Sequence, residues 1–142
     1  MAIERTATCT WEGTLAGGAG RLDAPGLDGR IALPTRTGPA GADTSPEELL
    51  AAAHAGCYAM ALAAVLTGAE VPPGRLDVRC TIAVDEVDGA LRITRSTLIV
   101  DADVDGLSRD ALRAAMDAAD MSCPYSALLR DAAADVTSEI AA

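Results

Sequence analysis

The sequence predicts an α+β domain, and three features of its hydropathy pattern lead to that class. Apolar and polar residues alternate with the period of a strand near the start of the chain and again over 76–84. Between these segments, residues 46–68 form a long apolar stretch that carries no charge after its first turn. A second helical pattern, apolar on one side only, follows at 108–119. Strands and helices in separate runs are typical of the α+β class.

The N-terminal third of the chain predicts short strands joined by turns. Over residues 3–12 one parity is mostly apolar and the other polar, which predicts a half-buried strand with Cys9 on the core side. Residues 13–45 are rich in Gly and Pro, so they predict hairpins and a long loop with short strands near 20–23 and 30–33.

A long helix is predicted from Pro46 to about residues 67–68. Ser45 and Glu48 have the spacing of a capping box, and Pro46 suits the first helical position. Because no charged residue follows Glu48, the helix is expected to be buried on every side.

The second half of the chain predicts a hairpin, two further helices and a last strand. Strands at 76–84 and 91–102 flank an Asp-Gly pair at 88–89 that is typical of a type I′ turn. The alternation of apolar and polar residues changes phase between residues 93 and 98, which indicates a β-bulge or a strand covered on both sides. The other expected elements are helices at 108–119 and 123–129 and a strand at 134–140. No repeat or boundary is visible, so a single domain over 1–142 is expected.

Composition and charge narrow the class of function. The formal net charge of −10 argues against binding to nucleic acid or anionic lipid. No run of 18 apolar residues and no leader-like segment occur, so a cytoplasmic protein outside the membrane is expected. The four cysteines lack close pairing, which predicts free thiols and, at most, a transient catalytic disulfide.

Two cysteines are candidates for chemistry. Cys123 precedes a proline at a predicted helix start, where free N–H groups and the helix dipole stabilise a thiolate. Cys57 lies within an uncharged helix, so its activation would need a cation from elsewhere; the alternative is a small core residue. Cys9 and Cys80 lie on the apolar sides of their predicted strands and are assigned no chemistry.

Two segments of the chain carry recognisable motifs around Cys57 and Cys123. Residues 44–62 read TSPEELLAAAHAGCYAMAL, which is similar to the first-cysteine helix of the OsmC/Ohr family of organic hydroperoxide reductases. The run Cys-Pro-Tyr-Ser at 123–126 resembles its second-cysteine motif, 66 residues after Cys57. A Trp-Glu-Gly run at 11–13 is similar to the OsmC branch, so the resemblance covers nearly the whole chain.

The resemblance implies a fold and a reaction. The fold would be OsmC-like, with antiparallel sheets around a long buried central helix in an intertwined homodimer. The reaction would be that of a thiol peroxidase, in which Cys57 reduces an organic hydroperoxide and Cys123 then forms a disulfide with it. The resemblance also implies re-reduction by a dithiol, such as a lipoylated protein. No cofactor and no metal are expected.

The family also carries an arginine and a glutamate at its active site. The glutamate matches Glu47 and the arginine best matches Arg36, although Arg21 or Arg30 are alternatives for the arginine. An ion pair between them would aim the guanidinium at the thiolate and the peroxide. Apart from the family, Glu47 is also explained as a first-turn carboxylate favoured by the helix dipole.

The residues beside the cysteines are expected to line a substrate pocket: His54, Tyr58 and Tyr125. His54 is alternatively a buried hydrogen-bonded side chain or the base of a Cys-His pair. The two tyrosines replace the Phe that commonly follows the first cysteine and the small aliphatic residue that often follows Cys-Pro, which bears on substrate preference.

Other functions remain open from the sequence. A non-catalytic ligand-binding or redox-sensing member of the same fold would leave hydroperoxide unconsumed. A zinc protein would use the four cysteines and His54, although no close ligand pair is present apart from His54 and Cys57. In a Cys-His acyl hydrolase or transferase, Cys123 would be dispensable.

Overall fold

The computed structural model describes residues 2–39 and 41–142, and these form two compact units. The first unit is Met1–Leu49 and the second is Leu50–Ala142, and each is described by itself. The expected domain over 1–142 and the expected loop over 13–45 include Met1 and Ala40, which lie outside the described residues. The single domain therefore stays a prediction.

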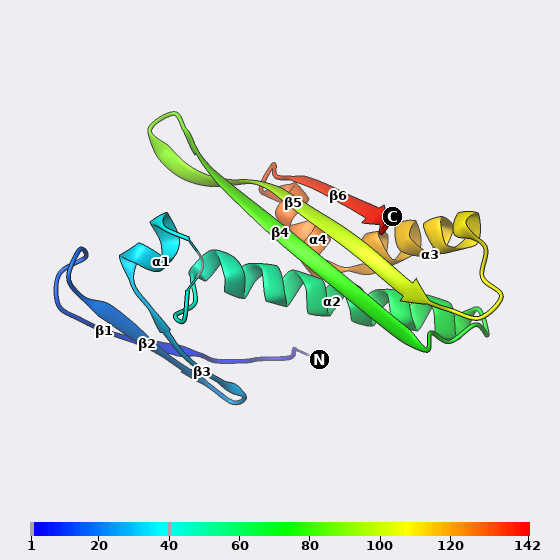
Figure 1. Cartoon of the computed structure of the whole chain (residues 1–142), viewed down its shortest axis with the longest axis horizontal. Coiled ribbons are helices and arrows are strands. Elements are labelled where there is room, and N and C mark those ends of the chain that lie inside the picture. The colour runs from blue at the N-terminus through cyan, green and yellow to red at the C-terminus, as the bar shows by residue number, and fades with distance from the viewer. Residues whose placement is uncertain (1, 40) are drawn as a thin grey trace. The chain divides into compact units, whose positions relative to one another are not determined.

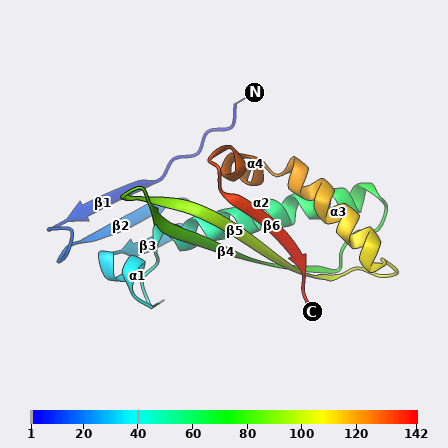
Figure 2. The same cartoon turned by 90° about the horizontal axis from the view of Figure 1, so that it is seen from above.

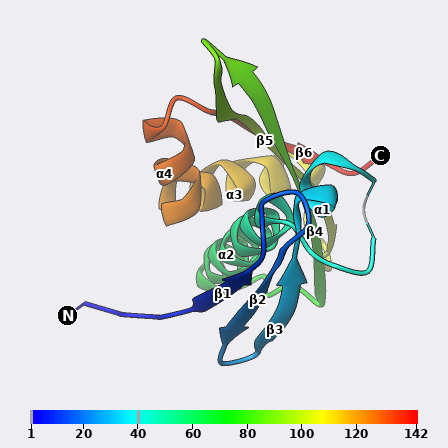
Figure 3. The ribbon, with the colours of Figure 1, turned by 90° about the vertical axis from the view of Figure 1, so that its left-hand side faces the viewer.

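The first unit contains a three-stranded antiparallel sheet with the order β1-β2-β3 (Figure 3). Its strands are β1 (Thr8–Glu12), β2 (Ala19–Ala24) and β3 (Leu27–Ile31). The predicted strand at 30–33 was placed too late, because a short helix, α1 (Leu33–Thr37), follows at once. Pro34 lies in its first turn, and the Thr35 hydroxyl donates to the Ala32 carbonyl. Both features favour a helix start.

The expectation that Cys9 faces a core is wrong, since every residue of β1 is exposed. Cys9 and Trp11 do share one side of the sheet, because a Cβ added at Gly20 would lie 2.8 Å from the Cys9 sulfur and 3.1 Å from the Trp11 ring. β1 is an edge strand, and Gly20 has no side chain to cover its neighbours. The alternation was interpreted correctly, but it does not guarantee a buried side.

The long helix α2 (Pro46–Gly68) has the predicted limits. Its capping box forms as expected: the Glu48 N–H donates to Ser45 Oγ over 3.1 Å, and the Ser45 N–H donates to Glu48 Oε2 over 2.8 Å. Burial on every side was wrong. One stripe is buried, and the opposite stripe is exposed. The buried residues are His54, Tyr58, Leu62 and Leu66. The exposed residues are Ala52, Gly56, Met60 and Ala64.

By length and composition alone, α2 is long and apolar enough to cross a membrane. From the sequence, no segment of this kind had been expected. A single helix of this kind is a weak indication, because the core helix of a soluble protein passes the same test.

In the second unit, β4 (Arg75–Val87) and β5 (Ala90–Asp103) form the predicted hairpin (Figure 1). Asp88 and Gly89 have φ values of 53° and 77°, as a type I′ turn requires. Ala83 pairs with Arg95 and Val84 with Ile93, so Thr94 is the extra residue of the predicted bulge.

The last strand, β6 (Asp135–Ile140), extends this sheet to the order β4-β5-β6 (Figure 2). It pairs with β5 in parallel, so the expectation of purely antiparallel sheets is wrong here. The parallel direction follows from the connection, since two helices intervene between β5 and β6.

These two helices are α3 (Arg109–Ser122) and α4 (Pro124–Asp131). Ser108 caps α3 by accepting from the Ala111 N–H over 3.1 Å. Leu and Met side chains of α3 pack with α2 and β5 into one core. Its fully buried members include Tyr58, Leu62, Leu98, Val100, Met116, Ala119 and Cys123. The core thus brings the end of α3 and the start of α4 onto α2.

Candidate active site

The two candidate thiols meet in the second unit. Cys57 is half-buried on α2, and Cys123 is fully buried at the N-cap of α4. Both are free thiols, and Cys57 packs against the core cluster that contains Cys123. The Cys123 side chain lies close enough to Cys57 to raise the pKa of its thiol. Residues that lie 66 positions apart in the sequence are therefore neighbours here.

The surroundings of Cys57 act on its pKa in opposite directions. Burial raises the pKa of the Cys57 thiol most, and the neighbouring Cys123 side chain raises it further. A hydrogen bond from the backbone N–H of Tyr125 lowers it. Since the net shift is upward, the groups that act on Cys57 in this structure do not favour the thiolate, and a cation beside the sulfur is needed to make it a good nucleophile.

Activation of Cys57 was expected to need a cation from elsewhere, but a helix N-terminus also acts on its sulfur. The N-terminus is that of α4, which the fold brings to Cys57. Pro124 has no N–H, and the Cys123 side chain makes no capping hydrogen bond, so the Tyr125 N–H is free to point at the sulfur. Only tertiary contact shows this, because Tyr125 and Cys57 belong to different helices.

The candidate cation lies in the first unit. Nε and Nη2 of Arg36 each approach Oε1 of Glu47 to 2.8 Å. The second oxygen, Oε2, is buried and has no hydrogen-bond partner within the described part of the chain. The two alternative arginines pair elsewhere, Arg21 with Asp28 and Arg30 with Asp43. Of the three, Arg36 is the one bound to Glu47.

An apolar cavity of about 150 Å³ adjoins Arg36 in the same unit. Its walls are mostly hydrocarbon and come from β1, the segment after it, the end of β3, α1 and the start of α2. They include Trp11, Leu15, Ile31, Leu33 and Pro46. The sequence did not predict this cavity, because its walls come from segments separated by Gly-rich turns.

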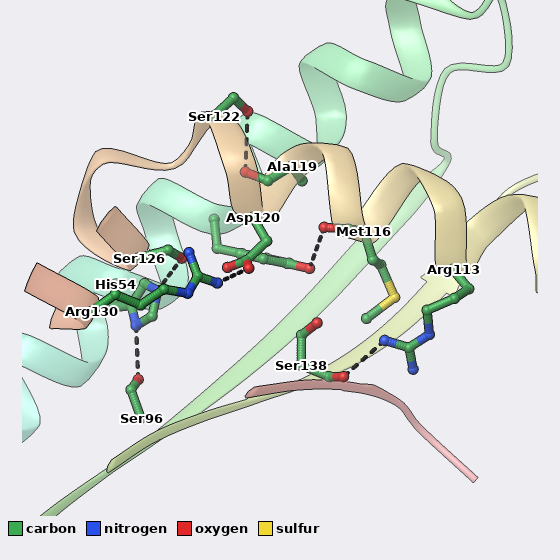
Figure 4. A network of polar contacts seen from close by, with 11 residues as sticks. His54, Ser96, Arg113, Met116, Ala119, Asp120, Ser122, Ser126, Arg130 and Ser138 are labelled. Carbon is green, nitrogen blue, oxygen red and sulfur yellow. Dashed lines mark hydrogen bonds and ion pairs between the residues drawn. The ribbon is translucent and has the colours of Figure 1, made fainter. Parts of the chain in front are cut away.

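Two of the three expected pocket residues are enclosed by protein instead. His54 and Tyr58 are both 0% exposed, so neither offers a surface to a substrate. The Tyr58 hydroxyl donates to the Met116 carbonyl over 3.0 Å, and both His54 ring nitrogens bind serines (Figure 4). Tyr125 is half-buried beside Cys57. The pocket assignment is therefore corrected for His54 and Tyr58.

The remaining cysteines lie outside the Cys57–Cys123 pair. Cys9 is exposed, and Cys80 is half-buried with its sulfur 3.3 Å from Ser96 Oγ and 3.8 Å from His54 Nδ1. Burial raises the pKa of the Cys80 thiol. Over residues 2–39 and 41–142, no three His, Cys, Asp or Glu side chains are arranged to hold a metal ion.

Comparison with known proteins decides the family. Residues 38–139 match the family model described as OsmC-like protein, which is well over half of the chain. This chain belongs to the OsmC family. It is 34% identical over 87 residues to Peroxiredoxin OsmC of Escherichia coli (strain K12), a match that spans 61% of each chain. It is 32% identical over 102 residues to the organic hydroperoxide resistance protein of Xanthomonas axonopodis pv. citri (strain 306), over 70% of each chain.

Solved structures of OsmC proteins share the fold. The organic hydroperoxide resistance protein OhrB of Bacillus subtilis is 30% identical, with a TM-score of 0.74 over 96% of this chain and 98% of that one. An OsmC-like protein of Vibrio cholerae has a TM-score of 0.80 over 99% of this chain and 100% of that one. At 16% identity, the second likeness concerns the fold alone.

Proposed function

We propose that this protein is a thiol peroxidase that reduces organic hydroperoxides to alcohols. The observation that carries the proposal is the contact between two free thiols, Cys57 and Cys123, with the Tyr125 N–H directed at Cys57. The names of its OsmC relatives, a peroxiredoxin and an organic hydroperoxide resistance protein, support the same chemistry.

The proposed reaction has three steps. The Cys57 thiolate attacks the outer oxygen of the hydroperoxide, the O–O bond breaks, and Cys57 becomes a sulfenic acid while the leaving alkoxide takes a proton from water and departs as the alcohol. The Cys123 thiol then displaces water from that sulfenic acid and forms a disulfide. An external dithiol reduces the disulfide by exchange and is itself oxidised to a disulfide.

Arg36 supplies the missing cation in this proposal. The upward shift in the pKa of Cys57 calls for a positive charge, and a guanidinium aimed by Glu47 meets that need. The buried free oxygen of Glu47 suits a hydroxyl donor, which the –OOH group of a hydroperoxide provides. Both features are consistent with an oxygen-rich ligand close to Arg36.

The apolar cavity beside Arg36 favours substrates with hydrocarbon tails. Cumene hydroperoxide should therefore be consumed faster than hydrogen peroxide, by about tenfold or more in kcat/KM, since burying even two methylenes contributes about 1.6 kcal/mol. Consumption of both peroxides with a dithiol present would be measured side by side. A clear advantage for hydrogen peroxide would contradict the proposed substrate class. No consumption of either would favour the alternative of a non-catalytic ligand-binding or redox-sensing protein.

We also propose that the protein is a homodimer held together by the exposed stripe of α2. Ala52, Gly56 and Ala64 are small, and a Cβ added at Gly56 would meet nothing within 4 Å in this chain. Such a face allows a second helix to pack closely. Light scattering at micromolar concentration should give twice the chain mass.

Gly56→Arg should reduce that mass to a single chain, because a long charged side chain does not fit a close helix interface. Ala118→Arg, on the exposed side of α3, is the matched control and should leave the mass doubled. A wild-type mass equal to one chain would rule out the dimer.

A further inference from the structure

A buried polar network in the second unit takes no part in the proposed chemistry. Its centre is His54, which is fully buried on α2. His54 Nδ1 lies 2.8 Å from Ser96 Oγ of β5, and Nε2 lies 2.9 Å from Ser126 Oγ of α4 (Figure 4). The ring therefore links three elements that meet around the start of α4.

His54 is a neutral group with no free nitrogen. Burial lowers the pKa of His54, and the charge of the nearby Arg130 lowers it further. A neutral imidazole has one donor and one acceptor nitrogen, and here each is bound to a serine hydroxyl. His54 is thus not available as the base of a Cys-His pair, although it lies three residues before Cys57.

Its partner Ser126 belongs to the turn that serves the two thiols. Ser126 directly follows Tyr125, whose N–H reaches Cys57, and it lies three residues after Cys123. Cys123, Ser126 and Leu129 form the buried side of this short segment. A shift of Ser126 would therefore move the Tyr125 N–H and the Cys123 sulfur together.

The two ends of α4 are fastened by different contacts. At its last turn, Arg130 forms an ion pair with Asp120 of α3 (Figure 4). At its first turn, the hydrogen bond between Ser126 Oγ and His54 Nε2 is a buried side-chain link to α2, the helix that carries Cys57. Both Ser126 and His54 are 0% exposed, so neither can exchange this bond for water without opening the core.

We propose that His54 is a positioning residue that holds the first turn of α4 against Cys57 through Ser126. The other ring nitrogen, Nδ1, is bound to Ser96 of β5 and makes no contact with α4. The inference rests on the proposed function in one respect only, namely that Cys57 and Cys123 form the working disulfide.

The test measures how readily the two thiols pair, without any hydroperoxide. Protein is equilibrated with mixtures of reduced and oxidised glutathione, in which one oxidised glutathione becomes two thiols as the Cys57–Cys123 disulfide forms. Peptide mass mapping identifies the disulfide. Ser126→Ala should lower the effective concentration of the pair by about tenfold, since proximity of the thiols sets this quantity.

Ser96→Ala is the matched control, because it also takes one hydroxyl from His54 but leaves the link to α4 in place. It should change the effective concentration by less than about twofold. Equal changes of the effective concentration in the two variants would overturn the proposal, because His54 would then have a structural role only. No change of the effective concentration in either variant, with equal losses of stability in urea unfolding, would overturn it as well.

Two substitutions of His54 repeat the test in case Ser126→Ala does not fold. The amide of His54→Gln reaches toward the position of Nε2 and keeps the bond to Ser126, whereas that of His54→Asn reaches toward Nδ1 and keeps the bond to Ser96. Pairing of the thiols should survive in the Gln variant and fall in the Asn variant; the reverse order would contradict the proposal. A wild type that pairs its thiols but consumes no hydroperoxide would refute the proposed function alone.

Discussion

Replacing Cys57 with serine is expected to lower hydroperoxide consumption by at least about a thousandfold, because a serine hydroxyl cannot replace the thiolate as a nucleophile toward oxygen. Cys57 is the half-buried thiol that receives the Tyr125 N–H, whereas Cys123 is fully enclosed. A peroxide therefore reaches Cys57 more readily. Consumption of cumene hydroperoxide with a dithiol in excess would be followed at steady state.

Cys123→Ser should behave differently from Cys57→Ser and so separate the two roles. Its first reaction with peroxide should remain fast, but Cys57 should stop as a sulfenic acid that is one oxygen atom heavier by mass. Cys9→Ser is the control, since Cys9 is exposed on β1 and takes no part in the proposed reaction. If Cys57→Ser retained the wild-type rate, or if Cys123 were the sulfur first oxidised, the assignment of roles would be wrong.

The elements of the fold were predictable where a local signal determines them. The capping box of α2, the type I′ turn at Asp88 and the bulge at Thr94 depend on neighbouring residues only. The parallel direction of β6 and the exposure of β1 were missed, because both depend on which elements lie beside a strand. Alternation of apolar and polar residues distinguishes the two sides of a strand, but it does not show whether another element packs on either side.

The features of the candidate site also separate into those predictable from local sequence and those that depend on tertiary contact. The motifs predicted Cys57, Cys123, Arg36 and Glu47 as site residues, and the structure places them in two pairs, one in each unit. Family membership does not show which groups tune Cys57. The Tyr125 N–H was missed because it comes from another helix, and His54 was assigned to a pocket because periodicity cannot distinguish a buried ring from an exposed one.

Arg36→Gln tests whether the Arg36 guanidinium is the positive charge that stabilises the Cys57 thiolate. Without the guanidinium, burial and Cys123 would leave the pKa of Cys57 above its usual value, so less thiolate would be present near neutral pH. Peroxide consumption should fall by about a hundredfold at pH 7, the usual effect of removing one aligned charge from a reacting centre. Since a thiol with a raised pKa forms its thiolate at higher pH, the variant should regain activity as pH rises.

The pH dependence of kcat/KM distinguishes this effect from loss of structure. The wild-type profile should reach its plateau at a lower pH than the Arg36→Gln profile, and Glu47→Gln should lie between them because the arginine remains but is held less firmly. Arg21→Gln is the matched control, as its ion pair with Asp28 is exposed on both sides and contributes little. An unchanged profile for Arg36→Gln, or a shift caused by Arg21→Gln instead, would mean that another cation activates Cys57.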